Sequence, residues 1–287
     1  MGALMAGPFL QDAPSTWLRP LGSNAPEVDA DCCCGQHDPE TGPRPPRRSG
    51  CLVCGAELIY LTVPVKAVCQ CCGVLESANA RCTQGHFVCD RCHGEEPGEI
   101  IMRVCLESRE HDAVALMQSI RAHPRFGMHG PEHHALVPAV ILAALRNAGW
   151  RIPDASIQDA VRRGQSVPGG ACAFMGACGA AVGVGIAISV LLEATPYEGR
   201  KRQLAQQATQ RALERIASLE APRCCQRDAW LALQEASRFL QEILGKSLMV
   251  DHPIDCRQLV RNKECIQARC PLWPATSAQQ PASHPCP

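Results

Sequence analysis

Four pairs of metal-ligand residues follow one another between residues 51 and 92, and they constrain the fold of this chain more than any other feature. Two or three residues separate the members of each pair, a spacing that lets both side chains reach one ion. The pairs are Cys51 and Cys54, Cys69 and Cys72, Cys82 and His86, and Cys89 and Cys92. Gly55 and Gly73 follow the first two pairs, where glycine permits a knuckle turn that directs two thiolates at one ion. The eight ligands predict two tetrahedral zinc sites.

Two ways of sharing these ligands are compatible with their spacing. Sequential pairing gives an all-cysteine ribbon site, followed by a site of three cysteines and one histidine. Interleaved pairing puts the ligand pairs that start at Cys69 and Cys89 on one ion. The stretch from Cys82 to Cys92 resembles the middle of a RING-type or treble-clef finger, and a helix after Cys92 slightly favours interleaving. Since no Cys-Pro-x-Cys pair follows Cys92, the resemblance implies a fold and no ligase activity.

The other cysteines also indicate a metalloprotein. The chain has 20 cysteines among 287 residues, whereas disulfide scaffolds are usually short secreted chains. Residues 1–17 show neither the basic nor the apolar region of a secretory signal. Many cysteines occur as close pairs beside glycine, histidine or proline, which is typical of metal ligands. These features predict a protein of the reducing cytoplasm.

The chain divides by composition into four parts. Residues 1–50 are rich in proline and glycine and predict a disordered tail; the small group Cys32, Cys33, Cys34 and His37 fits a tail that carries thiols better than an accessory metal site. Residues 51–97 form the zinc module, with strand-like alternation from Leu58 to Val68. Residues 98–273 form a helical domain, and residues 274–287 a second disordered tail. The predicted fold class is therefore mainly α.

Apolar periodicity places several helices in the second domain. Gly164 and Gly245 are expected to end two of them. Residues 171–192 carry no charge, a length that can span a bilayer. Their glycines and cysteines, and the lack of basic or aromatic flanks, instead favour a buried helix. The helices expected from periodicity are 109–122, 131–148, 154–163, 198–219 and 226–244.

Seven cysteines of the helical domain are candidate ligands of an iron–sulfur cluster, and their irregular spacing from distant segments is unlike that of zinc fingers. Six glycines from Gly169 to Gly185 suggest backbone that approaches a bulky group closely. A helix N-terminus after Cys225 is expected to lower the pKa of thiols there. The Cys270-Pro271 step occurs in ferredoxin-type ligation. Small buried hydrophobes are the alternative role. The candidates are Cys172, Cys178, Cys224, Cys225, Cys256, Cys265 and Cys270.

The motif from Met128 to His134 is the candidate for catalysis. Its His129, Glu132 and His133 offer imidazoles and a carboxylate at a helix start, able to ligate a metal or exchange protons near neutral pH. Consecutive helical residues diverge, so at most one of His133 and His134 is expected to share a site with His129. The alternative is a capping or solvated role.

Several of these segments resemble a known family. His129-Gly-Pro-Glu-His-His134, Pro168-Gly-Gly-Ala-Cys172, Gly176-Ala-Cys178-Gly-Ala, Pro222-Arg-Cys-Cys225 and Cys265–Pro271 are similar to an uncharacterised prokaryotic cysteine-rich family. The resemblance covers most of residues 51–273 and implies no activity. The core Cys178-Gly-Ala-x-x-Gly183, with the later cysteines, distantly resembles the redox-associated C-GCAxxG-C-C family. That signature's first cysteine has no counterpart here.

The functional expectation is a metal-binding protein of redox or sulfur metabolism, with two zinc ions and an iron–sulfur cluster. A non-catalytic, zinc-stabilised scaffold or regulator is the alternative, and attachment to a membrane a weaker one. Lys plus Arg equals Asp plus Glu, at 28 each, and aromatic residues make up 4%, so neither charge nor stacking indicates nucleic acid. A protein partner bound through the zinc module is expected. Substrate, reaction and oligomeric state do not follow from the sequence.

Overall fold

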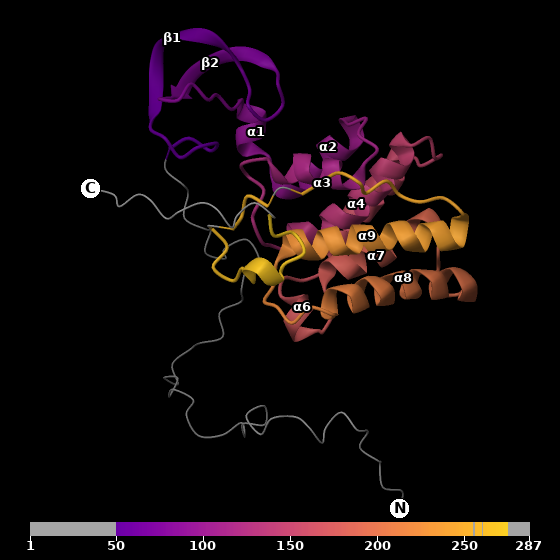
Figure 1. Ribbon diagram of the computed structural model, residues 1–287. Coiled ribbons are helices and arrows are strands. Elements are labelled where there is room, and N and C mark those ends of the chain that lie inside the picture. The colour runs from indigo at the N-terminus through magenta and orange to yellow at the C-terminus, as the bar shows by residue number, and fades with distance from the viewer. Residues whose placement is uncertain (1–49, 255, 260, 275–287) are drawn as a thin grey trace, which may run out of the picture. The chain divides into compact units, whose positions relative to one another are not determined.

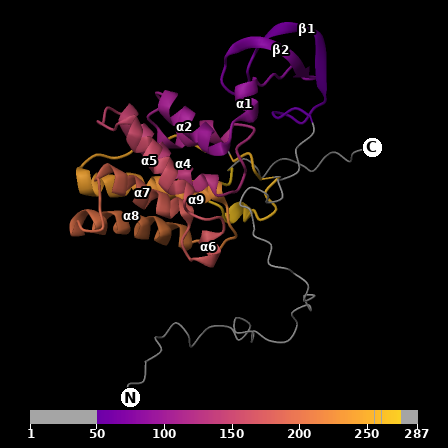
Figure 2. The same cartoon turned by 180° about the vertical axis from the view of Figure 1, so that it is seen from behind.

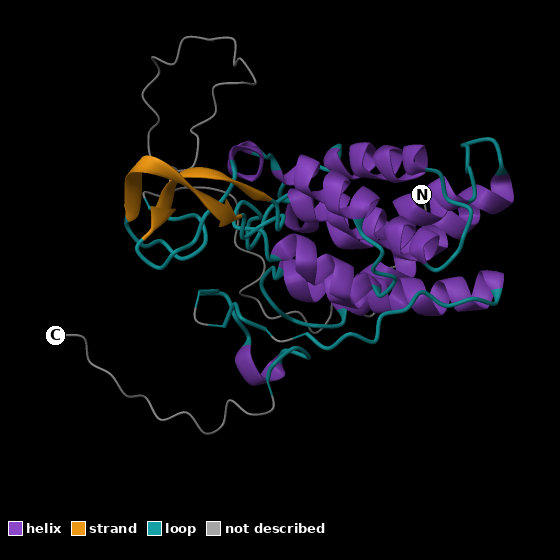
Figure 3. Cartoon of the chain, turned by 90° about the horizontal axis from the view of Figure 1, so that it is seen from above, coloured by secondary structure: helices purple, strands orange, loops and turns teal. Residues whose placement is uncertain are grey.

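The computed structural model describes residues 50–254, 256–259 and 261–274, which belong to one compact unit. The predicted tails, apart from Gly50 and Pro274, and the Cys32–His37 group lie outside these residues. The described part is mainly α-helical with one small hairpin, as predicted (Figures 1 and 3). Its elements are β1 Leu58–Val68, β2 Leu75–Cys82, α1 Asp90–Gly94, α2 Pro97–Glu107, α3 Ala113–Arg121, α4 Glu132–Asn147, α5 Asp154–Gln165, α6 Ala171–Phe174, α7 Gly179–Leu191, α8 Gly199–Ala217, α9 Cys225–Leu244 and the 3₁₀ turn η3 Gln267–Arg269.

The predicted zinc module is an antiparallel hairpin with a knuckle turn before each strand. Strand β1 has the bounds expected from its alternation, and β2 pairs with it from Leu58 opposite Cys82 to Val68 opposite Leu75. Gly55 and Gly73 have φ of +78° and +73°, which explains glycine after each Cys-x-x-Cys pair. The sequence did not reveal β2, because its small and charged residues show little β-propensity. The short helix α1 begins just after Cys89 and contains Cys92, and α2 is the helix that follows Cys92.

Helix α4 forms the centre of the helical domain. It packs against α2, α3, α5, α7 and α9 (Figure 2). Every residue from Ala135 to Leu145 is buried, so α4 is apolar on all sides, as its sequence predicted. Helix α7 also packs against α8, α5 and α9, which closes the core on the far side of α4.

The glycines of this domain serve close helix packing. A Cβ on Gly183 of α7 would lie 2.8 Å from the Pro138 ring of α4, and one on Gly164 would lie 2.5 Å from the Cα of Ala135. The prediction that Gly164 ends its helix was therefore wrong: α5 continues to Gln165, and the glycine is buried where α5 crosses α4. The buried-helix interpretation of residues 171–192 holds only for the 13-residue helix α7, since Phe174 and Met175, which come before it, are exposed. No described helix is long and apolar enough to cross a membrane.

Capping residues determine where helices begin and end, whereas apolar periodicity predicts these limits only approximately. Helix α3 begins four residues later than predicted, because the Asp112 carboxylate accepts the N–H groups of Val114 and Ala115 at 2.8 and 2.9 Å. Helix α9 ends at Gly245, which has φ +68°, as expected of a glycine C-cap.

Candidate metal centres

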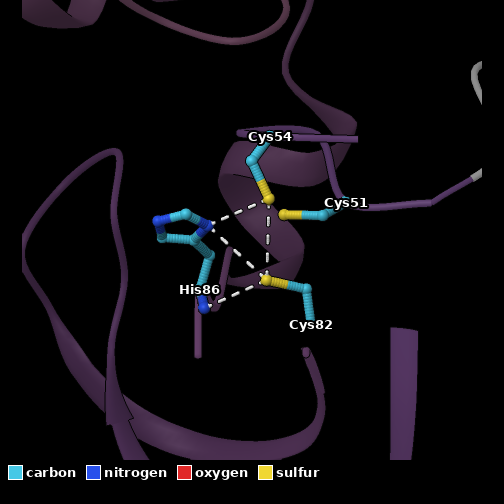
Figure 4. A group of neighbouring side chains, drawn as sticks. All are labelled: Cys51, Cys54, Cys82 and His86. Carbon is cyan, nitrogen blue, oxygen red and sulfur yellow. Dashed lines mark hydrogen bonds between the residues drawn. The ribbon is translucent and has the colours of Figure 1, made fainter. Parts of the chain in front are cut away.

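The first candidate centre lies at the open end of the hairpin, where β1 begins and β2 ends. Cys51, Cys54, Cys82 and His86 place their ligand atoms within 4.8 Å of one another (Figure 4). The Sγ atoms of Cys54 and Cys82 are 3.8 Å apart, and Nδ1 of His86 lies 3.3 and 3.5 Å from them. Burial opposes ionisation of Cys82, but N–H groups, that of His86 first, lower its pKa to about 7. This arrangement can hold one tetrahedral ion through three sulfurs and one nitrogen.

The second candidate centre joins the other knuckle to helix α1. The Sγ atoms of Cys72 and Cys89 are 3.8 Å apart. The N–H groups of Cys71 and Cys89 each donate to Sγ of Cys69 at 3.4 Å. Although burial opposes it, these donors lower the pKa of Cys69 to about 6, so this thiol ionises readily. The four residues of this group, whose ligand atoms lie within 4.8 Å of one another, are Cys69, Cys72, Cys89 and Cys92.

The ligand pairs are thus interleaved, and sequential pairing is not the arrangement observed. Cys82 is the last residue of β2 and His86 follows it, and both reach the first knuckle because β2 ends opposite the start of β1. Cys89 and Cys92 continue past it to the second knuckle, where Gln70 N–H donates to the Phe87 carbonyl at 2.9 Å. The hairpin therefore places each ligand pair.

A third group extends the second centre towards the helical domain. Cys71, Cys92 and His123 bring one ligand atom each within 4.8 Å of the others. His123 is buried, its Nε2 has no hydrogen-bond partner, and Glu95 lies 3.9 Å from that atom. Burial raises the pKa of Cys71 to about 12, so this thiol stays protonated. The sequence gave no signal for His123, because it lies 31 residues beyond Cys92 without a ligand-like spacing.

Three helix N-termini meet at one end of the helical domain. A Cβ on Gly179, the first residue of α7, would collide with the ring of His134 in the first turn of α4. The thiol of Cys225, the first residue of α9, accepts a hydrogen bond from the Gly130 backbone just before α4. The positive ends of three helix dipoles, of α4, α7 and α9, therefore converge on the sulfur-bearing residues Cys178 and Cys225.

A cavity of about 110 Å³ lies where these helices meet. Three cysteines from three separate segments line it: Cys172 of α6, Cys178 before α7 and Cys225 of α9. Its polar lining also includes His133, His134, Arg223 and Asp228, and glycine backbone makes up most of the rest of its wall. Because a single water needs only about 10–15 Å³ of such space, the cavity has room for a group larger than one ion.

The two adjacent histidines of the motif, His133 and His134, have different surroundings. Both ring nitrogens of buried His133 are engaged, by the Gly130 carbonyl and by the guanidinium of Arg121. Burial first, and Arg121 next, hold the pKa of His133 well below its usual range, so the ring is neutral. His134 Nδ1 lies 3.0 Å from the Val167 carbonyl, which leaves Nε2 as the nitrogen available to a ligand in the cavity.

The remaining members of the predicted catalytic set do not line the cavity. His129 Nε2 lies 3.3 Å from Oδ1 of Asn262, and its Nδ1 is buried without a partner. Glu132 folds back against Gly130, where its carboxylate fills the space of a side chain. The structure therefore brings His133 and His134 to one cavity, and neither histidine shares that cavity with His129 or Glu132.

Burial is the largest influence on the pKa values of two of the cavity thiols, and it raises them. It raises the pKa of Cys178 to about 11, and it also raises the pKa of Cys225. The expected lowering of the pKa at the start of α9 does not occur, because the loss of hydration outweighs the helix dipole and the hydrogen bond from Gly130. Without a bound cation these side chains are neutral thiols at pH 7, whereas a coordinating metal deprotonates them.

The four other candidate cysteines lie outside the cavity lining. Apart from the two module groups and the group with His123, no three His, Cys, Asp or Glu residues among the described ones place their ligand atoms within 4.8 Å of one another. Cys105, a fully buried residue of the core, has the structural role expected of an unliganded cysteine. The four are Cys224, which lies at the start of α9, and Cys256, Cys265 and Cys270, which lie in the C-terminal loop.

Comparison with known proteins identifies a family for this chain but indicates no activity. The model of a family of unknown function matches residues 101–273, which is more than half of the chain. The match covers the helical domain from within α2 and leaves out the zinc module. No curated protein and no solved structure matches the chain.

Proposed function

This chain belongs to DUF5714, a family of unknown function, and we propose that it is a cytoplasmic metal-binding protein that carries two zinc ions in its module and an iron–sulfur cluster in its helical domain. The proposal includes a role in redox or sulfur metabolism. The observation that carries it is the convergence of three cysteines from three segments on one cavity that also presents His134.

The distances in the module support zinc. In a regular tetrahedron the edge is about 1.63 times the bond, so zinc–sulfur bonds of about 2.3 Å put sulfurs about 3.8 Å apart. The two sulfur pairs, Cys54 with Cys82 and Cys72 with Cys89, are both 3.8 Å apart. Both groups are complete with four ligands, which is typical of structural zinc and leaves no open position for a substrate.

The lining of the cavity supports a cluster over free reactive thiolates. Cys172, Cys178 and Cys225 supply three thiol ligands, and Nε2 of His134 is the candidate for the fourth. Burial keeps at least two of these thiols protonated in the absence of metal, which disfavours a nucleophilic thiolate pair. A bound cluster would supply one-electron transfer, while the three helix N-termini stabilise its negative charge.

Metal analysis of the full chain, purified without oxygen, tests the proposal. We expect iron and acid-labile sulfide with visible absorbance, both lost in Cys178→Ala and retained in Cys105→Ala, which removes a core thiol that does not line the cavity. Zinc of the module remains in both variants. A colourless parent protein without iron refutes the cluster.

A scaffold without catalysis is the second candidate function, and one observation favours it. Ile59, Tyr60, Val63 and Leu75 of the hairpin are exposed apolar side chains, an unusual set for a free surface. They support the docking of a protein partner on the zinc module. Loss of partner binding in Tyr60→Ser, with metal content unchanged, is the expected result.

A further inference from the structure

The described residues of the C-terminal segment have little regular structure and little apolar burial. Its start is well fastened: the Asp112 carboxylate accepts the N–H groups of Asp251 and His252 at 2.7 and 2.9 Å, and Ala113 N–H donates to the Met249 carbonyl. Beyond Ile254, the only regular element among the described residues is the turn η3. The buried residues there are Gln258, Asn262 and Leu272, of which only the last is apolar.

Backbone N–H groups face the sulfurs of two cysteines in this segment. Cys265 accepts the N–H of Gln267 at 3.4 Å, the same two-residue knuckle bond that Cys69 makes with Cys71 at 3.4 Å in the second metal group. The thiol of Cys270 likewise accepts from the residue two positions on, Leu272. N–H groups directed at sulfur stabilise the thiolate form that a metal requires.

The start of α9 supplies a further thiol. Cys224 is the buried N-cap residue of α9, and the Arg227 side chain lies near its sulfur. The turn η3 is tied to this region because Arg269 donates to the Glu220 carbonyl at 3.5 Å. Burial raises the pKa of Cys270, and the neighbouring thiols of Cys256 and Cys265 raise it further.

Cys224 and Cys225 are adjacent in sequence but serve different surroundings. Cys225 lines the cavity and contacts Gly130, whereas Cys224 is absent from the cavity wall and lies near Arg227, Asp228 and the thiol of Cys270. Two consecutive residues at a helix start point about 100° apart, so one helix end can serve two sites.

We propose that Cys224, Cys256, Cys265 and Cys270 bind one zinc-class divalent ion in a closed four-thiolate site that fastens the C-terminal segment to the start of α9. No three of these sulfurs lie within 4.8 Å of one another, so the loop closes around the ion as it binds, as metal sites on irregular segments do. Each thiol that coordinates releases its proton. The site goes beyond the proposed cluster and does not depend on it.

Metal content of the full chain tests this site. We expect Cys256→Ala and Cys270→Ala each to lose one zinc ion per chain and to keep all iron and sulfide. Cys105→Ala, a matched loss of a buried thiol, keeps every metal. Cys178→Ala loses iron only, so failure of the cluster proposal is distinguishable from failure of this one. Unchanged zinc in both C-terminal variants, or loss of iron from them, overturns the site.

A second measurement covers variants that fail to fold. In the native parent protein, Cys256, Cys265 and Cys270 are expected to resist alkylation and to become labelled after a zinc chelator is added, as read by mass spectrometry of peptides. Trypsin cleavage after the exposed Arg261 and Lys263 is expected to accelerate in parallel. Rapid alkylation of these thiols before chelation overturns the proposal.

Discussion

Paired cysteine variants distinguish interleaved from sequential zinc ligation. Cys51 and Cys82 belong to one group in the structure, so replacing both with alanine removes two ligands of a single ion. Replacing Cys51 and Cys69 removes one ligand from each of the two groups. Relative to the parent, the first double variant should therefore lose one zinc ion and the second two. Sequential pairing predicts the reverse, since it puts Cys51 and Cys69 on one ion and Cys82 on the other.

The structure also sets the size of the effect. The 3.8 Å separation of Cys54 and Cys82 corresponds to metal–sulfur bonds of about 2.3 Å, those of an unstrained zinc site. Structural zinc of this kind contributes about 10–16 kcal/mol of binding free energy at neutral pH. A site short of even one thiolate loses a large part of that, so it should release its ion to a strong chelator that leaves an intact site loaded.

The assay is zinc content by mass spectrometry after dialysis against a competing chelator. Circular dichroism checks that the helical domain has folded in each variant, and Cys105→Ala shows the effect of losing a non-ligand thiol. X-ray absorption at the zinc edge should report about 2.3 Å for zinc–sulfur. Two zinc ions lost from the first double variant and one from the second would refute the interleaved arrangement.

Three further predictions concern stability, each measured by denaturant unfolding. Gly164→Ala should cost about 1–3 kcal/mol because its Cβ would meet Ala135 at 2.5 Å, whereas Gly199→Ala, with open space, should be neutral; equal effects would contradict the packing argument. Glu95→Gln should cost about 3 kcal/mol, since it leaves the Arg103 side chain, only 13% exposed, without its carboxylate at 2.6 Å. The Arg103 hydrogen bond lowers the pKa of Glu95 in the folded state. The stabilisation by this carboxylate is therefore complete above about pH 4.3, the pKa in the unfolded chain, and is lost as the pH falls through the lower pKa of the folded state. Because burial depresses the pKa of His133, the parent should lose about 1.4 kcal/mol per pH unit below about pH 6.5 as the unfolded chain takes up the proton. His133→Gln should remove that slope, and an unchanged slope would show that His133 is charged in the native state.

The sequence by itself determined the local features. The Cys-x-x-Cys-Gly pairs define two knuckles, because a positive φ after the second cysteine requires glycine. Alternation gave β1, and periodicity gave the long helices, since both are set by which neighbours in the chain share a face. The fully apolar stretch around Leu142 indicated the central buried helix α4.

Only the tertiary structure decided which distant residues meet. The interleaved pairing follows from the register of β1 with β2, a long-range pairing that ligand spacing does not encode. The glycines of α7 proved to serve helix packing, because what a missing side chain makes room for depends on the neighbouring helix. The pKa of Cys225 rises where a helix start alone predicts a fall, since burial is a property of the folded core. His134 faces a cavity formed by three helix ends that are far apart in the chain, so its place there is set by packing and not by its own motif.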